Sequence, residues 1–277
     1  MCPDTVRRIH PSCYAPAPHR RIVAVLIRGV LIGVGVWFGV GLAAAEEIQI
    51  AVASNFSQVA KVLAARFEDS SAHRVTLIPG STAKHFAQIE NGAPFDIFLA
   101  ADSRHPQELE DSGTAVKGTR FTYAFGELVL WSPRANYVDG EGRVLETGDY
   151  RHLAVANPDL APYGTAAREV LVSMRLWEAL QDRTVRGENI GQAFQFVASG
   201  NAELGFVARS QIIGISSPAM TGSYWQIPQR LYSPIEQQAV LVRDHAAAWD
   251  FIDFLKSDPA RAIIQQNGYS VPGAGEH

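Results

Sequence analysis

The sequence predicts an α/β fold in which mostly parallel sheets are covered by helices. Short apolar runs of strand length alternate with amphipathic helical segments from residue 48 onward, and this alternation is typical of parallel sheets. A second series of the same kind begins at Leu153. Several of the predicted helices start with small hydroxyl or amide residues directly after a strand, so that helix N-termini are expected at the strand ends.

Residues 1–45 are expected to be a cleaved signal peptide. Arginines precede an apolar run over residues 29–42, and Ala43-Ala44-Ala45 supplies the small residues that a signal peptidase requires. An uncleaved membrane anchor is the alternative, since residues 22–45 are long enough to span a bilayer. Arg28 interrupts that run, and its small-residue end favours cleavage. We therefore expect the protein in the periplasm.

The composition of the remaining chain excludes several functional classes. Cys2 and Cys13 are the only cysteines and both precede residue 45, so the exported chain has no disulfide, thiol nucleophile or cysteine metal site. The formal net charge of the whole chain is −4, and no basic run follows the signal segment. Such a chain is a poor binder of nucleic acid or anionic membranes. An anion would have to be held locally, against the net charge of the protein.

The first strand–helix unit covers residues 48–67. Residues 48–53 are expected to form a buried strand, and apolar residues recur at helical spacing from Val59 to Phe67. Ser54 or Asn55 is expected to be the N-cap of that helix. At such a junction the first backbone N–H groups lack intrahelical partners and the helix dipole adds positive charge, so an anion can bind without Lys or Arg. An ordinary N-cap is the alternative interpretation.

A second unit repeats this design. An apolar strand over residues 75–79 is followed by Gly80 at the turn, Ser81 and Thr82 at the cap, and a helix over residues 83–89. Two hydroxyl-capped helix starts this close in sequence are expected to face one small space. The sequence therefore indicates a candidate anion site that contains Ser54, Asn55 and Ser81.

The rest of the chain continues the alternation of strands and helices. Residues 123–132 are expected to be one strand that carries the chain out of the first lobe, and residues 140–150 to be a loop. The remaining expected strands cover residues 95–99, 153–156, 204–208 and 237–242, and the remaining expected helices cover residues 104–111, 166–180, 190–199, 249–255 and 259–266.

Six motifs, in this order and spacing, resemble the periplasmic molybdate-binding proteins of ABC transporters. They are Ala53-Ser54-Asn55-Phe56, Gly80-Ser81-Thr82-Ala83-Lys84, Gly92-Ala93-Pro94-Phe95-Asp96-Ile97-Phe98, Ala161-Pro162-Tyr163-Gly164, Glu188-Asn189-Ile190 and Leu204-Gly205-Phe206-Val207. The resemblance covers about Ile48 to Val271, essentially the whole exported chain.

The resemblance implies a two-lobed fold of the type II periplasmic binding proteins, with an oxyanion held in the cleft between the lobes. It implies a first lobe of residues 46–125 and 234–277 and a second lobe of residues 126–233. Carried over by motif, the residues that bind molybdate or tungstate are Ser54, Asn55, Ser81, Tyr163 and Ile190.

One position departs from part of that family. Some members place a ligand-contacting tyrosine after the Leu-Gly-Phe-Val strand, where this chain has Ala208. The resemblance therefore places this chain with the members that use a tyrosine in the A-P-x-G turn, here Tyr163. It further implies that the protein delivers its anion to an ABC transporter permease. We expect no cofactor, and we expect a monomer because nothing in the sequence indicates an oligomer.

Other functions are alternatives to this hypothesis. A binding protein for another oxyanion such as sulfate is the nearest, and a secreted hydrolase is more remote. The serines lack a G-x-S-x-G context and the histidines lack metal-site spacing, so we do not expect an enzyme. Lys84, His85 and His245 are expected to be solvated or satisfied side chains, and Asp96 a structural cap or turn partner.

Overall fold

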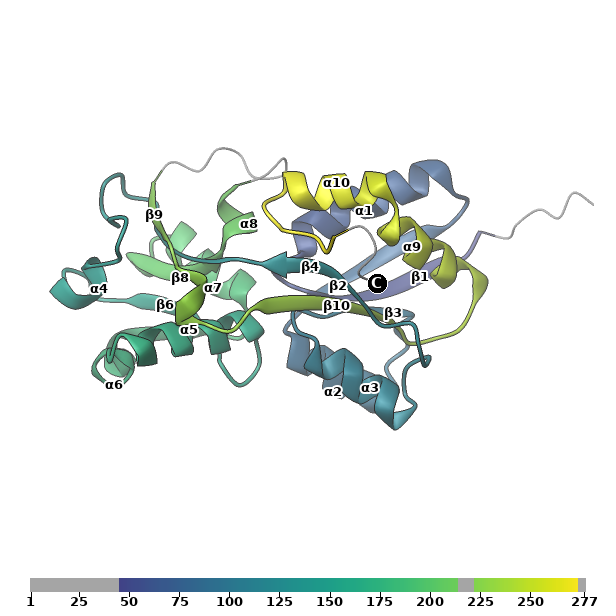
Figure 1. Cartoon of the computed structure of the whole chain (residues 1–277), viewed down its shortest axis with the longest axis horizontal. Helices are drawn as coiled ribbons and strands as arrows, with labels where there is room; N and C mark the ends of the chain where they lie inside the picture. Colours follow the sequence, from purple (N-terminus) through teal and green to yellow (C-terminus); the bar gives the residue numbers. More distant parts are fainter. Residues whose placement is uncertain (1–44, 214–221, 274–277) are drawn as a thin grey trace, which may run out of the picture. The chain divides into compact units, whose positions relative to one another are not determined.

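The computed structural model describes residues 45–213 and 222–273 (Figure 1). The predicted signal peptide, apart from Ala45, and both cysteines lie outside the described residues. Within the described ranges, no helix combines the length and apolar character needed to cross a membrane.

The first of two five-stranded sheets has the strand order β2-β1-β3-β10-β4. Its strands are β2 (Arg74–Gly80), β1 (Glu47–Ala53), β3 (Ile97–Leu99), β10 (Ile235–Leu241) and β4 (Phe121–Gly126). β1 runs parallel to both β2 and β3, and the register pairs Ala53 with Gly80. β1 and β2 therefore end at the same edge of the sheet, which is where the first two predicted helix starts lie.

Helices cover both faces of the first sheet (Figure 1). The helices on one face are α1 (Ser57–Ser70), α9 (Ala246–Lys256) and α10 (Asp258–Gln266), and those on the other are α2 (Thr82–Glu90) and α3 (Arg104–Ser112). Each face has its own cluster of buried apolar side chains, centred on Phe56, Leu63 and Phe251 on the first and on Phe98 and Ile89 on the second.

The second sheet has the strand order β7-β6-β8-β5-β9. Its strands are β7 (Thr184–Gly187), β6 (Leu153–Ala156), β8 (Leu204–Ala208), β5 (Leu128–Ser132) and β9 (Ser223–Gln226). The helices of this part are α4 (Val144–Thr147), α5 (Pro162–Ser173), α6 (Trp177–Leu180), α7 (Ile190–Ala198) and α8 (Arg209–Ile212), with short 3-10 segments at Gln181–Arg183 and Gln229–Leu231. One large apolar cluster around Trp131, Phe206 and Leu171 holds this part together.

The predicted α/β architecture is confirmed, and each sheet is mixed. Four strands of each sheet run in one direction, and one strand, β10 in the first sheet and β5 in the second, runs antiparallel to both of its neighbours. Each of these two reversed strands is the one by which the chain enters its sheet from the other sheet. The prediction of a single strand over residues 123–132 was wrong. This segment divides at Glu127 into β4, which pairs with β10, and β5, which pairs with β8.

Three element boundaries also differ from expectation. The helix expected over residues 166–180 begins four residues earlier, at Pro162, and divides into α5 and α6 at Arg175, which has a positive φ of 60°. A proline at the first helical position has no N–H to lose and its φ already suits a helix, which explains the earlier start. The loop expected over residues 140–150 contains the one-turn helix α4.

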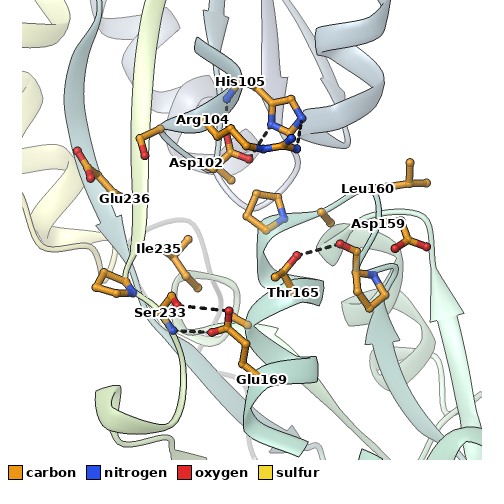
Figure 2. Close-up of a pocket in the computed structure, with 17 residues that line it drawn as sticks. Asp102, Arg104, His105, Asp159, Leu160, Thr165, Glu169, Ser233, Ile235 and Glu236 are labelled. Atoms are coloured by element: carbon orange, nitrogen blue, oxygen red, sulfur yellow. Dashed lines mark hydrogen bonds and ion pairs between the residues drawn. The ribbon is translucent and has the colours of Figure 1, made fainter. Parts of the chain in front are cut away.

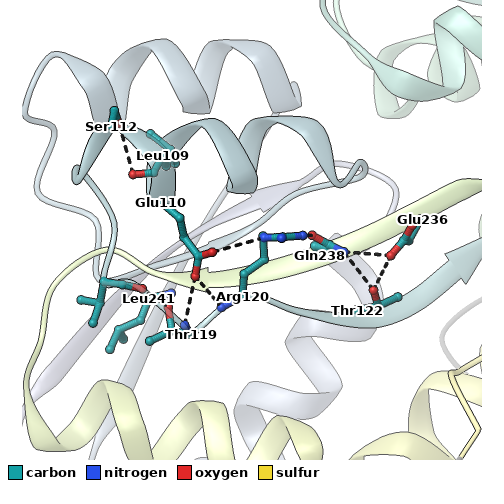
Figure 3. Close-up of polar contacts among 10 residues, drawn as sticks. Leu109, Glu110, Ser112, Thr119, Arg120, Thr122, Glu236, Gln238 and Leu241 are labelled. Carbon is teal, nitrogen blue, oxygen red and sulfur yellow. Dashed lines mark hydrogen bonds and ion pairs between the residues drawn. The ribbon is translucent and has the colours of Figure 1, made fainter. Parts of the chain in front are cut away.

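A polar network fixes β10 beside β4 (Figure 3). Arg120 pairs with Glu110 of α3 at 3.3 Å and donates to Gln238 Oε1 at 2.7 Å. Gln238 Nε2 in turn donates to Thr122 and Glu236 at 3.1 and 2.8 Å. The register of the β10–β4 pair shifts between Gln237 and Gln238, so the two neighbouring glutamines contact different residues.

Candidate functional site

Ser54 and Asn55 occupy the turn between β1 and α1. The backbone N–H of Ser54 donates to Gly80 O of β2 at 2.9 Å, which ties this turn to the end of the neighbouring strand. The prediction that Ser54 or Asn55 is the N-cap was wrong: α1 begins at Ser57, and Phe56 is the residue before it. Phe56 is fully buried among Tyr123 and Tyr269, so packing rather than side-chain capping sets the start of this helix.

Ser81 is the N-cap residue of α2, as predicted. It has an extended backbone, and its side chain makes no capping hydrogen bond. Only 1% of Ser81 is exposed, and its Oγ has no partner in the described part of the chain. Burying a hydroxyl without a hydrogen-bond partner costs free energy, so the unpartnered Ser81 Oγ indicates a position where a ligand binds.

Tyr163 and Ile190 occupy equivalent positions on the second sheet. β6 and β7 are parallel, and the register pairs Ala156 with Gly187. Tyr163 lies in the first turn of α5, which follows β6, and Ile190 is the first residue of α7, which follows β7. Asn189 caps α7 through its Oδ1, which accepts the Gln192 N–H at 3.1 Å. Two helix N-termini therefore lie at one edge of this sheet as well.

The two edges meet at these helix starts. Gly191 N of α7 donates to Ser54 Oγ at 3.1 Å, and Ala83 N of α2 donates to Leu160 O at 3.2 Å. A Cβ on Gly191 would lie 3.2 Å from the Ser54 Cβ, so the close approach suits glycine here. Lys84 Nζ forms an ion pair with Glu188 at 2.6 Å beside them. Three contacts thus hold residues of the two sheets together around the candidate site.

All five predicted site residues line one small cavity, whose empty space, including the part that opens to solvent, is about 170 Å³. The complete lining is Ala53, Ser54, Asn55, Gly80, Ser81, Thr82, Ala101, Ala161, Pro162, Tyr163, Asn189 and Ile190. Every residue in this set is uncharged. The structure therefore brings together residues that are far apart in sequence, around a space that suits an anion of a few atoms rather than a sugar or a peptide.

Hydrogen-bond donors dominate this lining. Ser54 Oγ accepts the Gly191 N–H, so its own proton is available to a ligand. Burial raises the pKa of the Tyr163 hydroxyl well above its ordinary value, so this group also keeps its proton. Ile190 adds a first-turn backbone N–H at the positive end of α7. Such an arrangement can hold a negative ion without a cationic side chain.

Asn55 contacts the cavity in a different way from the other predicted residues. Its Nδ2 donates to Gln237 Oε1 at 2.8 Å and to Tyr269 Oη at 3.1 Å, both within the protein. The amide nitrogen is thereby engaged, and its Oδ1 has no partner in the described residues. The side-chain nitrogen of Asn55 is therefore engaged within the protein, and both of its hydrogens are used.

Sequence reasoning missed residues that lie in and beneath the cavity. Thr82 lines it, and its Oγ1 accepts the Ala101 N–H at 3.1 Å. Gln237, fully buried in β10, contacts both Asn55 and Tyr163. A glutamine within an apolar strand pattern was the available signal for Gln237, since an unpaired buried amide is costly.

Other side chains were expected to be solvated or structural. Asp96 is structural: it accepts the Gln49 N–H at 2.6 Å and pairs with Arg243 and His245 at 2.8 and 2.9 Å. His85 is buried, with only 3% exposed: its Nδ1 pairs with Gln88 Oε1 at 3.1 Å, and its Nε2 has no partner among the described residues. Lys84 is half-exposed and is paired with Glu188.

A second, larger cavity lies near the first (Figure 2). It encloses about 920 Å³ of empty space, and its charged lining consists of Asp102, Arg104, His105, Asp159, Glu169 and Glu236. Carboxylates outnumber the arginine there, and several are already hydrogen-bonded: Asp102 to His105 at 2.7 Å and Glu169 to the Ser233 N–H at 2.6 Å. This cavity is therefore a poor site for an anion.

The described residues contain no group of three or more His, Cys, Asp or Glu that is arranged to hold a metal ion. The uncharged donors of the small cavity favour an anionic ligand instead.

Comparisons with known proteins agree with this geometry. Residues 48–270 match the family model described as bacterial extracellular solute-binding protein. The chain is 47% identical over 240 residues to the molybdate-binding protein ModA of Azotobacter vinelandii, covering 84% of this chain and 95% of that protein. It is 46% identical over 230 residues to ModA of Rhodobacter capsulatus, covering 82% and 89%.

A solved structure is similar as well. The periplasmic molybdate-binding protein of Azotobacter vinelandii superposes with a TM-score of 0.78 at 41% identity, covering 81% of this chain and 99% of that chain.

Proposed function

This chain belongs to the bacterial extracellular solute-binding proteins, and on that premise we propose that it captures molybdate or tungstate in the periplasm and delivers it to the permease of an ABC importer. It is a carrier and not an enzyme. The oxyanion is its cargo, and it works as a monomer without a cofactor or a nucleic-acid partner.

The uncharged lining of the small cavity carries this proposal, together with the unpartnered Ser81 Oγ inside it. The hydroxyls of Ser54, Ser81 and Tyr163 and the backbone N–H groups of Asn55 and Ile190 donate to the anion. Donors come from both sheets, so the ligand itself joins the two halves of the site.

The chemistry of the ligand fits a site made of donors. Molybdate and tungstate carry no proton at neutral pH, so each oxygen accepts hydrogen bonds and offers none. Hydrogen phosphate carries a proton, and that proton needs an acceptor that a ring of donors does not supply. Each unmade buried hydrogen bond costs about 1–3 kcal/mol. Sulfate is smaller, so donors placed for molybdate are stretched around it.

The names of the relatives support the same ligand. The proteins of Azotobacter vinelandii and Rhodobacter capsulatus that share nearly half of their residues with this chain are both molybdate-binding proteins. The uncharged donors that line the cavity favour the same class of anion.

Calorimetric titration of the exported chain with molybdate, tungstate, sulfate and phosphate tests the proposal. We expect molybdate and tungstate to bind with similar affinity, and sulfate and phosphate to bind at least about a hundredfold more weakly, which corresponds to about 3 kcal/mol. Ser81→Asp serves as the negative control, since it places a carboxylate in the cavity. Sulfate binding as tight as molybdate binding would contradict the assignment.

A further inference from the structure

A buried polar network lies directly beneath the anion cavity. Its centre is Gln237 of β10, which is fully buried, and its other members are Asn55, Tyr123, Tyr163 and Tyr269. Asn55 and Tyr163 also line the cavity, whereas Gln237 does not. The network therefore connects the site to residues that do not themselves touch the ligand.

The direction of the hydrogen bonds in this network is fixed from one end. Tyr269 Oη donates to the backbone carbonyl of Asn55 at 2.9 Å, and a carbonyl can only accept. With its single proton placed there, Tyr269 Oη must accept its other hydrogen bonds. It does so from Asn55 Nδ2 at 3.1 Å and from Ser210 Oγ at 2.8 Å. The side-chain amide of Asn55 is thereby held with its nitrogen toward Tyr269.

The same direction passes on to Gln237. Asn55 Nδ2 donates its second hydrogen to Gln237 Oε1 at 2.8 Å. Tyr123 Oη lies 3.1 Å both from this oxygen and from the Ala100 carbonyl, and its one proton can go to only one of them. Turning the Gln237 amide around would point an N–H group at the Asn55 donor. The oxygen of Gln237 therefore faces Asn55, and its Nε2 faces Tyr163, 3.3 Å from the Oη.

Tyr163 is left with one available role. Its Oη accepts from Gln237 Nε2 at 3.3 Å, so its own proton is left to donate. The neighbouring Tyr269 Oη already accepts two hydrogen bonds, from Asn55 and Ser210, so the Tyr163 proton is left for an acceptor in the cavity. Gly126 packs against both groups: a Cβ at this position would lie 2.1 Å from Tyr163 Oη and 2.7 Å from Gln237 Nε2. No larger residue fits there without separating them.

We propose that Gln237 is a positioning residue that fixes the Tyr163 hydroxyl as a hydrogen-bond donor to the bound oxyanion and thereby helps to exclude protonated oxyanions. This inference rests on the proposed function and extends it from the residues that contact the anion to one that does not. A tyrosine hydroxyl that is free to turn could accept a hydrogen bond from the P–OH group of hydrogen phosphate. With its orientation fixed by Gln237, Tyr163 offers no acceptor for that proton.

Gln237→Glu reverses one bond of the network and keeps the others. One oxygen of its side chain still accepts from Asn55 Nδ2, as the Gln237 oxygen does. The second oxygen of the glutamate takes the place of the Nε2 donor, so the Tyr163 hydroxyl must donate its hydrogen bond to that oxygen. Tyr163 can then no longer donate to the bound anion. We expect molybdate to bind at least about tenfold more weakly, the loss of one charge-assisted hydrogen bond.

Gln238→Glu is the matched control for added charge (Figure 3). It makes the same substitution at the next residue of β10, where the side chain contacts Arg120, Thr122 and Glu236 and not Tyr163. The decrease in molybdate affinity that both variants share measures the long-range repulsion between the added carboxylate and the bound anion. The part specific to Gln237→Glu measures the reversed hydrogen bond, and thermal unfolding without ligand reports whether each variant folds.

Tyr163→Phe tests whether Gln237 acts through Tyr163. In the Tyr163→Phe background, Gln237→Glu should weaken molybdate binding no more than Gln238→Glu does. In the protein that keeps Tyr163, Gln237→Glu should also lower the preference for molybdate over phosphate. Equal losses in the two backgrounds, or an unchanged preference, would overturn the inference. If Gln237→Glu does not fold, Gly126→Ala replaces it in the same cycle, since it forces the Tyr163 hydroxyl and the Gln237 amide apart.

The same cycle separates this inference from the proposed function. If the wild type binds sulfate instead of molybdate, the proposed ligand is wrong, and the cycle is run with sulfate with the same expected coupling. A wild type that binds none of molybdate, tungstate and sulfate overturns both.

Discussion

Removal of the Ser81 hydroxyl should weaken ligand binding without weakening the fold. Ser81 Oγ is buried, makes no capping bond to α2 and has no partner in the described part of the chain. Ser81→Ala therefore breaks no hydrogen bond of the ligand-free protein. We expect its free energy of unfolding to stay within about 0.5 kcal/mol of the wild type, because no mechanism of large destabilisation applies.

The effect on the bound state is much larger. A hydrogen bond to a charged group contributes about 1.5–3 kcal/mol, so Ser81→Ala should weaken molybdate binding about ten- to a hundredfold. Ser81→Asp should abolish binding, because it puts a carboxylate beside a dianion in a cavity whose lining has no cation. Aspartate is an equally good residue at a helix N-cap, so this variant should still fold.

Two measurements on the same samples check this prediction. Thermal unfolding without ligand gives the stability of each variant, and titration with molybdate gives the affinity. The reasoning is refuted by a Ser81→Ala protein that is clearly destabilised yet binds as tightly as the wild type, or by a Ser81→Asp protein that still binds molybdate.

Two further perturbations separate the ligand site from its surroundings. Lys84→Met removes the half-exposed ion pair with Glu188, which contributes about 0.2–1 kcal/mol. Molybdate should therefore bind at most about fivefold more weakly, and the difference in affinity should disappear in high salt. A much larger, salt-independent loss of affinity would show that Lys84 holds the anion. Burial lowers the pKa of His85 from its ordinary value of 6.5, so the folded protein favours the neutral imidazole. The stability that depends on neutral His85 is fully present above pH 6.5 and is lost as the pH falls through the lowered pKa. His85→Gln should reduce the decline in unfolding free energy on acidification, and an identical acid dependence in the two proteins would argue against this role.

The sequence predicts the site well where it depends on local rules. Ser54 and Ser81 each follow a strand, and because β1 and β2 are parallel neighbours the two serines lie at the same edge of the sheet. Tyr163 and Ile190 follow the parallel strands β6 and β7 in the same way. The strand–helix junction indicated Ser54, Asn55 and Ser81 from the sequence alone. Tyr163 and Ile190 came from the resemblance to a known family, since no strand was predicted over residues 184–187, where β7 lies.

Features that depend on long-range packing escaped the sequence analysis. Gln237 contacts Asn55 across 182 positions of the chain, and Tyr269 contacts it across 214. No periodicity in the sequence encodes such pairs. The division at Glu127 was missed for a related reason, since an apolar run does not reveal that its two halves pair with β10 and β8 in different sheets.

Locating molybdenum in crystals of the complex by its anomalous scattering tests the central claim most directly. The account predicts one molybdenum position in the small cavity, with oxygens within hydrogen-bond distance of Ser54, Ser81 and Tyr163 and of the backbone N–H groups at Asn55 and Ile190, and no Lys or Arg nitrogen in contact. A molybdenum position in the larger cavity beside Arg104, or one held by Lys84, would contradict it.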